Sequence, residues 1–127
     1  LSLIMFDIDK FKDINDNYGH LVGDHILIKI TEIIKNEIRE IDLFARYGGD
    51  EFMILNPEIK LSDAVKLAER LQKKLENTDF DKVKNVSCSF GAAELKAEDD
   101  IDSLLKRLDD ALYKAKEKRN KIYYFKD

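Results

Sequence analysis

The apolar run at positions 1–8, LSLIMFDI, constrains the fold most, because it is typical of a strand that is buried on both faces. Such a strand needs cover from both sides, which requires a sheet with helices packed around it. The segment DIDKFKDINDNYGH that follows is too polar to continue the strand. At 127 residues the chain has the length of a single domain, so one sheet with its covering helices is expected.

The remaining elements are predicted from periodicity and turn residues. Helices are expected over residues 24–40, from about residue 62 with Ser62 as the N-cap, and over residues 97–118. Further strands are expected over residues 42–47, 51–55, 83–94 and 121–125, with Gly48-Gly49 supplying the positive φ of a hairpin turn. The order predicts an α+β fold: a ferredoxin-like βαββαβ core, a mostly antiparallel sheet, and an extra C-terminal helix and strand.

Composition removes several classes of function. The net charge is -4, and the longest basic stretch is KAKEKRNK near the end, which argues against nucleic-acid binding. No apolar run approaches the roughly 20 residues that a membrane-spanning helix needs, so no membrane contact by this domain is expected. The single cysteine, Cys88, cannot form an intrachain disulfide, and a buried thiol in the reducing cytoplasm is the expected reading.

Acidic residues gather at two places where chemistry is possible. Asp7 and Asp9 end the first strand on the same face, and Asp50 and Glu51 follow the glycine pair. If the hairpin pairs with the first strand, Asp50 approaches Asp7, and two converging carboxylates repel unless a cation lies between them. Mg²⁺, which binds one or two carboxylates together with phosphate and water, is the natural ion. Alternatively, Asp7 and Asp9 cap the turn that follows.

Other chemistries lack their motifs in this sequence. There is no GxxxxGK[ST] phosphate loop, no GxGxxG dinucleotide motif and no GxSxG nucleophile elbow. His20 and His25 are too few for a zinc site and are expected to make local hydrogen bonds. Metal-assisted phosphoryl or nucleotidyl transfer therefore remains as the favoured chemistry.

Several blocks in order resemble the GGDEF family of diguanylate cyclases. These are FDIDKFKDINDNYGHLVGDHIL at residues 6–27, GGDEF at residues 48–52, SFGAAE at residues 89–94 and LLKRLDDALYKAK at residues 104–116. The resemblance implies a fold similar to the palm of polymerases. It also implies condensation of two GTP molecules into cyclic di-GMP with release of pyrophosphate.

Roles for the acidic residues follow from the same resemblance. It implies that Asp7, the Ile8 carbonyl and Asp50 hold Mg²⁺, or Mn²⁺ in its place, and that Glu51 shares a second ion. Asp50 would accept the proton of the 3′-hydroxyl, and Lys12 would neutralise phosphate charge in the transition state.

Substrate contacts implied by the resemblance fall in three segments: Asn15, His20 and Asp24; Gly48 and Gly49; and Lys116 with either Arg119 or Lys118. The glycines would let the backbone approach the nucleotide. An Asp carboxylate can accept from both N–H donors of the guanine edge, which adenine lacks, so Asp24 favours GTP over ATP. In the family a glycine normally follows the last helix, whereas this chain reads AKEKRN there.

Regulation and assembly complete the expectations. The sequence REID places Arg39 and Asp42 in the register of the family's RxxD product-inhibition site, which binds cyclic di-GMP; a surface ion pair is the plainer alternative. Because one chain offers one nucleotide site and the product is symmetric, a homodimer is expected, at least transiently. Residues 1–127 would be the catalytic domain without the family's N-terminal helix and an upstream regulatory module. The rival reading is a catalytically weak module that binds GTP or cyclic di-GMP as a sensor.

Overall fold

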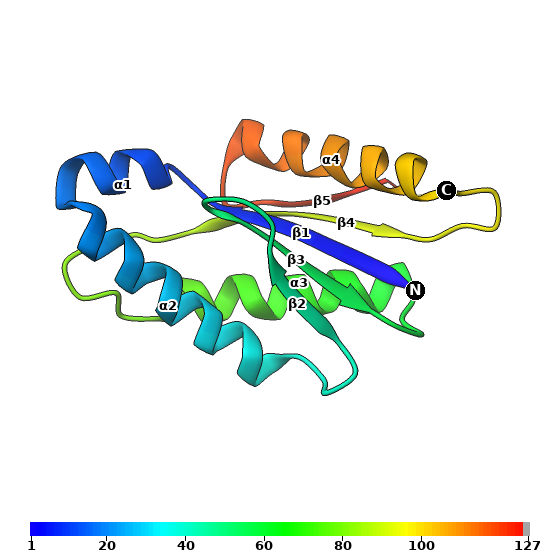
Figure 1. Cartoon of the computed structure of the whole chain (residues 1–127), viewed down its shortest axis with the longest axis horizontal. Helices are drawn as coiled ribbons and strands as arrows, with labels where there is room; N and C mark the ends of the chain where they lie inside the picture. Colours follow the sequence, from blue (N-terminus) through cyan, green and yellow to red (C-terminus); the bar gives the residue numbers. More distant parts are fainter. Residues whose placement is uncertain (126–127) are drawn as a thin grey trace.

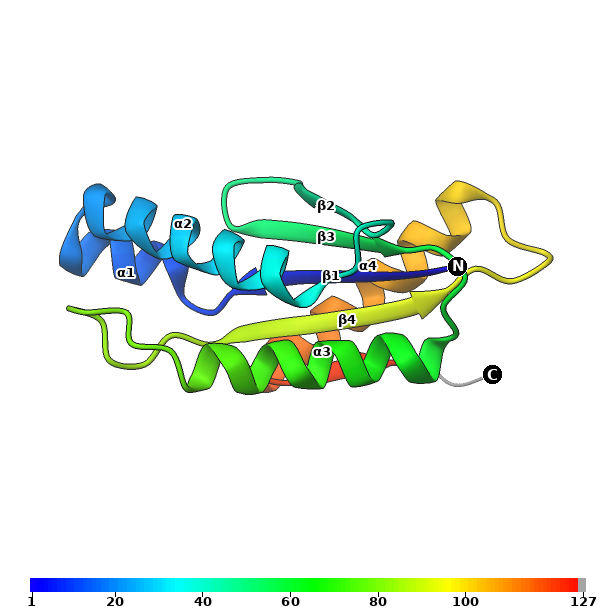
Figure 2. The same ribbon diagram turned by 90° about the horizontal axis from the view of Figure 1, so that it is seen from below.

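The protein, described by a computed structural model over residues 1–125, is a five-stranded sheet with helices on both faces (Figures 1 and 2). Within those residues the elements are β1 (Ser2–Ile8), α1 (Phe11–Tyr18), α2 (His20–Glu37), β2 (Leu43–Arg46), β3 (Glu51–Asn56), α3 (Leu61–Glu76), β4 (Cys88–Glu94), α4 (Ile101–Lys118) and β5 (Ile122–Tyr124). The strand order is β2-β3-β1-β4-β5. Only β5 pairs in parallel, with β4, so the predicted ferredoxin-like core with an extra helix and strand is confirmed.

Strand β1 lies at the centre of the sheet and is buried at all seven positions. Its neighbours, β3 and β4, both run antiparallel to it. Figure 1 shows α2 and α3 on one side of the sheet and α4 on the other, which confirms the cover on both faces that the apolar run predicted. No helix within residues 1–125 combines the length and the apolar character that crossing a bilayer demands.

The face under α2 and α3 holds the main core. Phe6 stacks on Phe52 with ring centroids 5.1 Å apart and meets Phe90 at 5.0 Å, while Phe44 extends the stack from β2 at 5.6 Å from Phe52. The opposite face carries a smaller cluster of Leu3, Met5 and Ala93 beneath Leu104, Leu108 and Leu112 of α4. Leu43, on β2 at the edge of the sheet, is 64% exposed.

Helix α1 was not predicted, and α2 begins at His20 rather than at residue 24. The eight residues of α1 bury only Ile14, with Phe11 partly buried against the core, so the apolar signal of this short polar segment is weak. Helix α3 begins at Leu61 with Lys60 as its N-cap, which makes the predicted Ser62 cap wrong. Strand β4 begins at Cys88, later than the predicted residue 83.

The hairpin between β2 and β3 also differs from the prediction. Among the described glycines only Gly19 has a positive φ, so neither Gly48 nor Gly49 supplies one. Residues 47–50 form the connection, and a loop of this length can turn through ordinary backbone conformations, unlike a two-residue hairpin turn.

Candidate functional site

The pairing of β1 with β3 brings the predicted acids together. Asp7 lies directly opposite Glu51 in the register, and the Ile8 N–H donates to the Asp50 carbonyl at 3.2 Å. Asp50 and Glu51 are half-buried, whereas Asp7 is 2% exposed. The end of β1 and the start of β3 therefore form one acidic site on the sheet face that α4 covers.

Asp7 is held in an unfavourable electrostatic environment. Burial raises its pKa above the ordinary 3.8, and the nearby charges of Asp50 and Asp9 act in the same direction. Lys116 on α4 opposes them: its Nζ lies 2.7 Å from Asp7 Oδ2, and this hydrogen bond raises the pKa of Lys116. Asp7 Oδ1 is buried and has no hydrogen-bond partner among the described residues.

The oxygens at this site fit a divalent cation. A bare, buried carboxylate oxygen beside a second carboxylate is the hard donor set that Mg²⁺ or Mn²⁺ prefers. Within residues 1–125, no group of three or more Asp, Glu, His or Cys side chains has the arrangement of a metal site. The set expected from the resemblance, Asp7, Asp50 and the Ile8 carbonyl, offers two carboxylates and one carbonyl, which Mg²⁺ tolerates when phosphate and water complete its shell.

Arg46 holds the tip of the β2–β3 hairpin, a role that the sequence interpretation missed. Its Nε donates to the carbonyls of Gly48 at 3.1 Å and Gly49 at 3.0 Å. The N–H groups of Tyr47 and Gly48 both donate to the Glu51 carbonyl, at 2.8 and 3.2 Å. The arginine just before the glycine pair was the available signal. Its bonds order the loop that carries Asp50.

Lys12, Asn15, His20 and Asp24 lie on the α1–α2 pair that follows β1, and all but half-buried Asn15 are exposed. Asn15 Oδ1 is buried without a partner among the described residues. It presses on α2 so closely that a Cβ at Gly23 would lie 1.9 Å from it. Gly23 therefore gives Asn15 the room to pack against α2, and the sequence interpretation did not single out this glycine.

The start of α1 carries no side-chain cap. Its N-cap is Lys10, with φ 55, and no side chain within residues 1–125 is recorded as a hydrogen-bonding cap of the first turn. The alternative in which Asp7 and Asp9 cap this turn is therefore wrong. The leading N–H groups of a helix without a side-chain cap are suited to bind an anion.

Arg119 is the cation that lies near Lys116. Its Nη1 is 3.8 Å from Asp9 Oδ1, and its charge acts to lower the pKa of Lys116. Lys118 and Arg119 both line a cleft that Lys84 and Tyr18 also line. Of the two candidates that the sequence left open, Arg119 is the one with recorded interactions with Asp9 and Lys116.

Arg39 and Asp42 lie at the other end of the hairpin strands. Arg39 Nη2 meets Asp42 Oδ1 at 2.7 Å and also donates to the Pro57 carbonyl at 2.8 Å. The side chain of Asp42 is 2% exposed and that of Arg39 is 42% exposed. Both line a pocket of about 250 Å³ whose other charged residues are Glu37, Asp63, Lys66 and Arg70. The predicted RxxD pair thus exists as an ion pair at a pocket of mixed charge.

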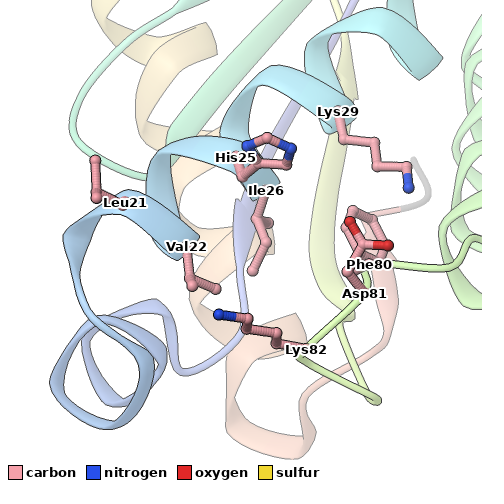
Figure 3. Close-up of a pocket in the computed structure, with 8 residues that line it drawn as sticks. All are labelled: Leu21, Val22, His25, Ile26, Lys29, Phe80, Asp81 and Lys82. Atoms are coloured by element: carbon pink, nitrogen blue, oxygen red, sulfur yellow. The ribbon is translucent and has the colours of Figure 1, made fainter.

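A different pocket, of about 240 Å³, lies between α2 and the loop after α3 (Figure 3). Its lining residues are Leu21, Val22, His25, Ile26, Lys29, Phe80, Asp81 and Lys82. Val22 and Ile26 project from α2 toward this loop. None of the predicted site residues lines it, so it is separate from the acidic site.

Known proteins match nearly the whole length of this chain. The family model described as "Diguanylate cyclase, GGDEF domain" matches residues 1–121. Diguanylate cyclase DosC of Escherichia coli K12 is 37% identical over 131 residues, which cover 99% of this chain and 28% of DosC. The chain thus spans a little over a quarter of the length of the curated relatives it matches.

Solved structures share the fold. Diguanylate cyclase SiaD of Pseudomonas aeruginosa, solved with its activator SiaC, superposes with a TM-score of 0.90 and 34% identity over 98% of this chain and 49% of SiaD. The corresponding domain of DgcB from Caulobacter crescentus, solved with c-di-GMP, gives a TM-score of 0.90 and 28% identity over 97% of this chain and 74% of that one.

Proposed function

Because this chain belongs to the GGDEF domain family of diguanylate cyclases, we propose that it condenses two GTP molecules into cyclic di-GMP and releases two pyrophosphates. The observation that carries the proposal is the bare Oδ1 of buried Asp7, next to Asp50 across the β1–β3 pair. A protein gains nothing in stability from such a pair, so a ligand that supplies positive charge explains it best.

In the proposed reaction the 3′-oxygen of one GTP bonds to the α-phosphorus of the other, and the bond between the α- and β-phosphates breaks. Asp50 accepts the hydroxyl proton and passes it to water. Asp7, Asp50 and the Ile8 carbonyl would hold Mg²⁺, with Glu51 available to a second ion, and the metal supplies charge neutralisation when bound. Lys116, Arg119 and the uncapped start of α1 hold the phosphates, and Lys12 neutralises charge on the transition state.

In this proposal, residues of α1 and α2 select guanine over adenine. Asn15 Oδ1, buried and unpaired, and the exposed carboxylate of Asp24 both accept hydrogen bonds, which matches the N–H donors of guanine. Adenine would leave these acceptors unpaired, and an unpaired buried acceptor is strongly unfavourable. His20, at the start of α2, lies close to the substrate in this proposal.

The product is symmetric, and each chain has one such site, so two chains face each other as a C2 dimer during the reaction. We assign product inhibition to the mixed-charge pocket of Arg39, whose half-exposed guanidinium suits a phosphate of cyclic di-GMP. Asp42 then orients Arg39. The DgcB structure with c-di-GMP supports a product site on this fold. The same pocket favours the second candidate, a sensor that binds cyclic di-GMP without turnover.

The test is incubation of the purified chain with Mg²⁺ and GTP, followed by separation of the products by mass. Cyclic di-GMP and pyrophosphate are expected from GTP and not from ATP, with specific activity rising with protein concentration. Asp50→Asn should remove turnover while the circular dichroism spectrum is kept, and Asp24→Ser should relax the choice of base. Binding of cyclic di-GMP without synthesis at any protein concentration would instead identify the sensor.

A further inference from the structure

Asp9 lies two residues beyond Asp7 and is similarly buried, yet its surroundings are the opposite. Ser87 Oγ donates to Asp9 Oδ2 at 2.6 Å, and Ser89 Oγ donates to Oδ1 at 2.6 Å. The backbone N–H of Asn120 donates to Oδ2 at 2.8 Å. Both oxygens of Asp9 are therefore engaged, whereas Asp7 keeps one oxygen bare.

The bond from Asn120 fixes the turn that follows α4. Arg119 and Asn120 have φ values of 59° and 49°, in the left-handed region that a side chain disfavours. The conformation is held by four bonds to Asn120: its N–H donates to Asp9, Gln72 Nε2 donates to its carbonyl at 2.7 Å and to its Oδ1 at 3.3 Å, and its Nδ2 donates to Glu76 at 3.0 Å.

The position of this turn determines the position of two cations. Lys116 lies one helical turn earlier on α4 and bonds Asp7 at 2.7 Å. Arg119, the C-cap residue of α4, lies 3.8 Å from Asp9. If the turn moved away from β1, the end of α4 would move with it, and both cations would leave the acidic site.

We propose that Asp9 is a positioning residue that ties the end of α4 to the end of β1 and so places Lys116 and Arg119 to receive the phosphates of the substrate. The identity of that substrate, GTP, rests on the proposed function. The tie itself is a property of the free protein and can be measured without nucleotide. Asp9 has no part in binding the metal.

The first experiment is hydrogen exchange on the nucleotide-free protein. In Asp9→Asn, which loses the charge that strengthens the bond, the amides of residues 119–121 should exchange on the order of tenfold to a hundredfold faster. Amides of the β1–β3 pair should keep their wild-type rates. Ser87→Ala, which removes one other donor from the same oxygen, is the matched control and should leave residues 119–121 protected. Unchanged exchange in Asp9→Asn overturns the proposal.

The second experiment is steady-state kinetics with GTP. Asp9→Asn should raise the KM for GTP about tenfold or more, while the Mg²⁺ concentration for half-maximal rate stays within about twofold. Arg119→Ala should share the KM effect and Lys118→Ala should not. A large rise in the Mg²⁺ requirement at unchanged KM would make Asp9 a metal ligand and overturn the assignment.

The experiments allow for two outcomes: a variant that does not fold and a wild type without activity. If Asp9→Asn does not fold, it is combined with Arg119→Gly, which relieves the left-handed backbone, and the exchange comparison is made against Arg119→Gly alone. If the wild type makes no cyclic di-GMP, the proposed function fails, whereas the exchange experiment still decides whether Asp9 holds the turn.

Discussion

The two faces of the sheet are built from alternate residues of the same strand, yet they differ in what they can do. Toward α2 and α3, β1 presents Ile4, Phe6 and Ile8, which enter the aromatic core. Toward α4 it presents Leu3 and Met5 and then, at its carboxyl end, Asp7. The packing that stabilises the fold is therefore concentrated on the face toward α2 and α3. The face toward α4 has a charged residue instead of an apolar one at the carboxyl end of β1.

Two buried acids, Asp42 and Asp7, differ in the direction in which their pKa values are shifted. Asp42, whose neighbour Phe44 enters the α2–α3 core, accepts bonds from Arg39. Burial acts to raise the pKa of Asp42, but hydrogen bonds from Arg39 and Asn56 outweigh it and hold that pKa below 3.8. The pKa of Asp7 shifts the other way, first of all because of burial. A buried acid that the fold satisfies stabilises it, and one left unsatisfied is available for a ligand.

Asp7→Asn should give the largest effect of these variants: a loss of activity without a loss of stability. Cyclic di-GMP synthesis should fall by at least about a thousandfold, since charge stabilisation by the metal is lost. The free energy of unfolding should stay the same or rise, because the raised pKa of Asp7 means that its charged form is disfavoured in the folded protein. Denaturant unfolding and product assays on the same preparation test both; a large loss of stability would contradict the division between faces.

Phe6→Ala, one residue away, should have the reverse profile. Removing a fully buried ring that contacts Phe52 and Phe90 should lower the free energy of unfolding by about 3–5 kcal/mol. Leu43→Ala, on the open edge of the opposite face, is the control and should change stability by no more than about 0.5 kcal/mol. Comparable losses in the two variants would remove the distinction between a structural and an open face.

Gly23→Ala and Gly49→Ala form a matched pair at the two halves of the substrate site. A Cβ at residue 23 would overlap Asn15, so this variant should lose about 1–3 kcal/mol of stability and bind GTP about tenfold more weakly. At residue 49 a Cβ would meet nothing within 4 Å, so folding should be unchanged. Any loss of activity in Gly49→Ala then reports contact with the nucleotide, measured as KM beside the melting temperature.

Asp42→Asn should produce the smallest effect, visible in the pH dependence of stability. Because the pKa of Asp42 is lowered, its charge stabilises the fold above about pH 3.8, and this contribution is lost as the pH falls through the lowered pKa. The variant should therefore be less stable by about 1–2 kcal/mol at neutral pH and converge on the wild type in acid. Urea unfolding at a series of pH values gives the comparison, and a constant difference down to the most acidic pH would argue against it.

The parts predicted from sequence are those with a strong local signal. The apolar run of β1 and the helical stripes were enough for the core topology, and ordered motifs were enough for the acids at residues 7 and 50. Helix α1 was not predicted because it buries one residue. Its stability comes from packing on α2 rather than from its own apolar pattern. Arg46, Gly23 and the role of Asp9 depend on contacts that only tertiary structure creates.

The alternation in β1 has a consequence for strand pairing during folding. Shifting the strand by one position against β3 and β4 would turn Asp7 inward, among the rings of Phe52 and Phe90. An unpaired carboxylate there would be far costlier than a misplaced leucine. Asp7, which is proposed to serve the reaction, thus also destabilises the nearest wrong register of β1. With leucine at position 7, the shifted register would be penalised less.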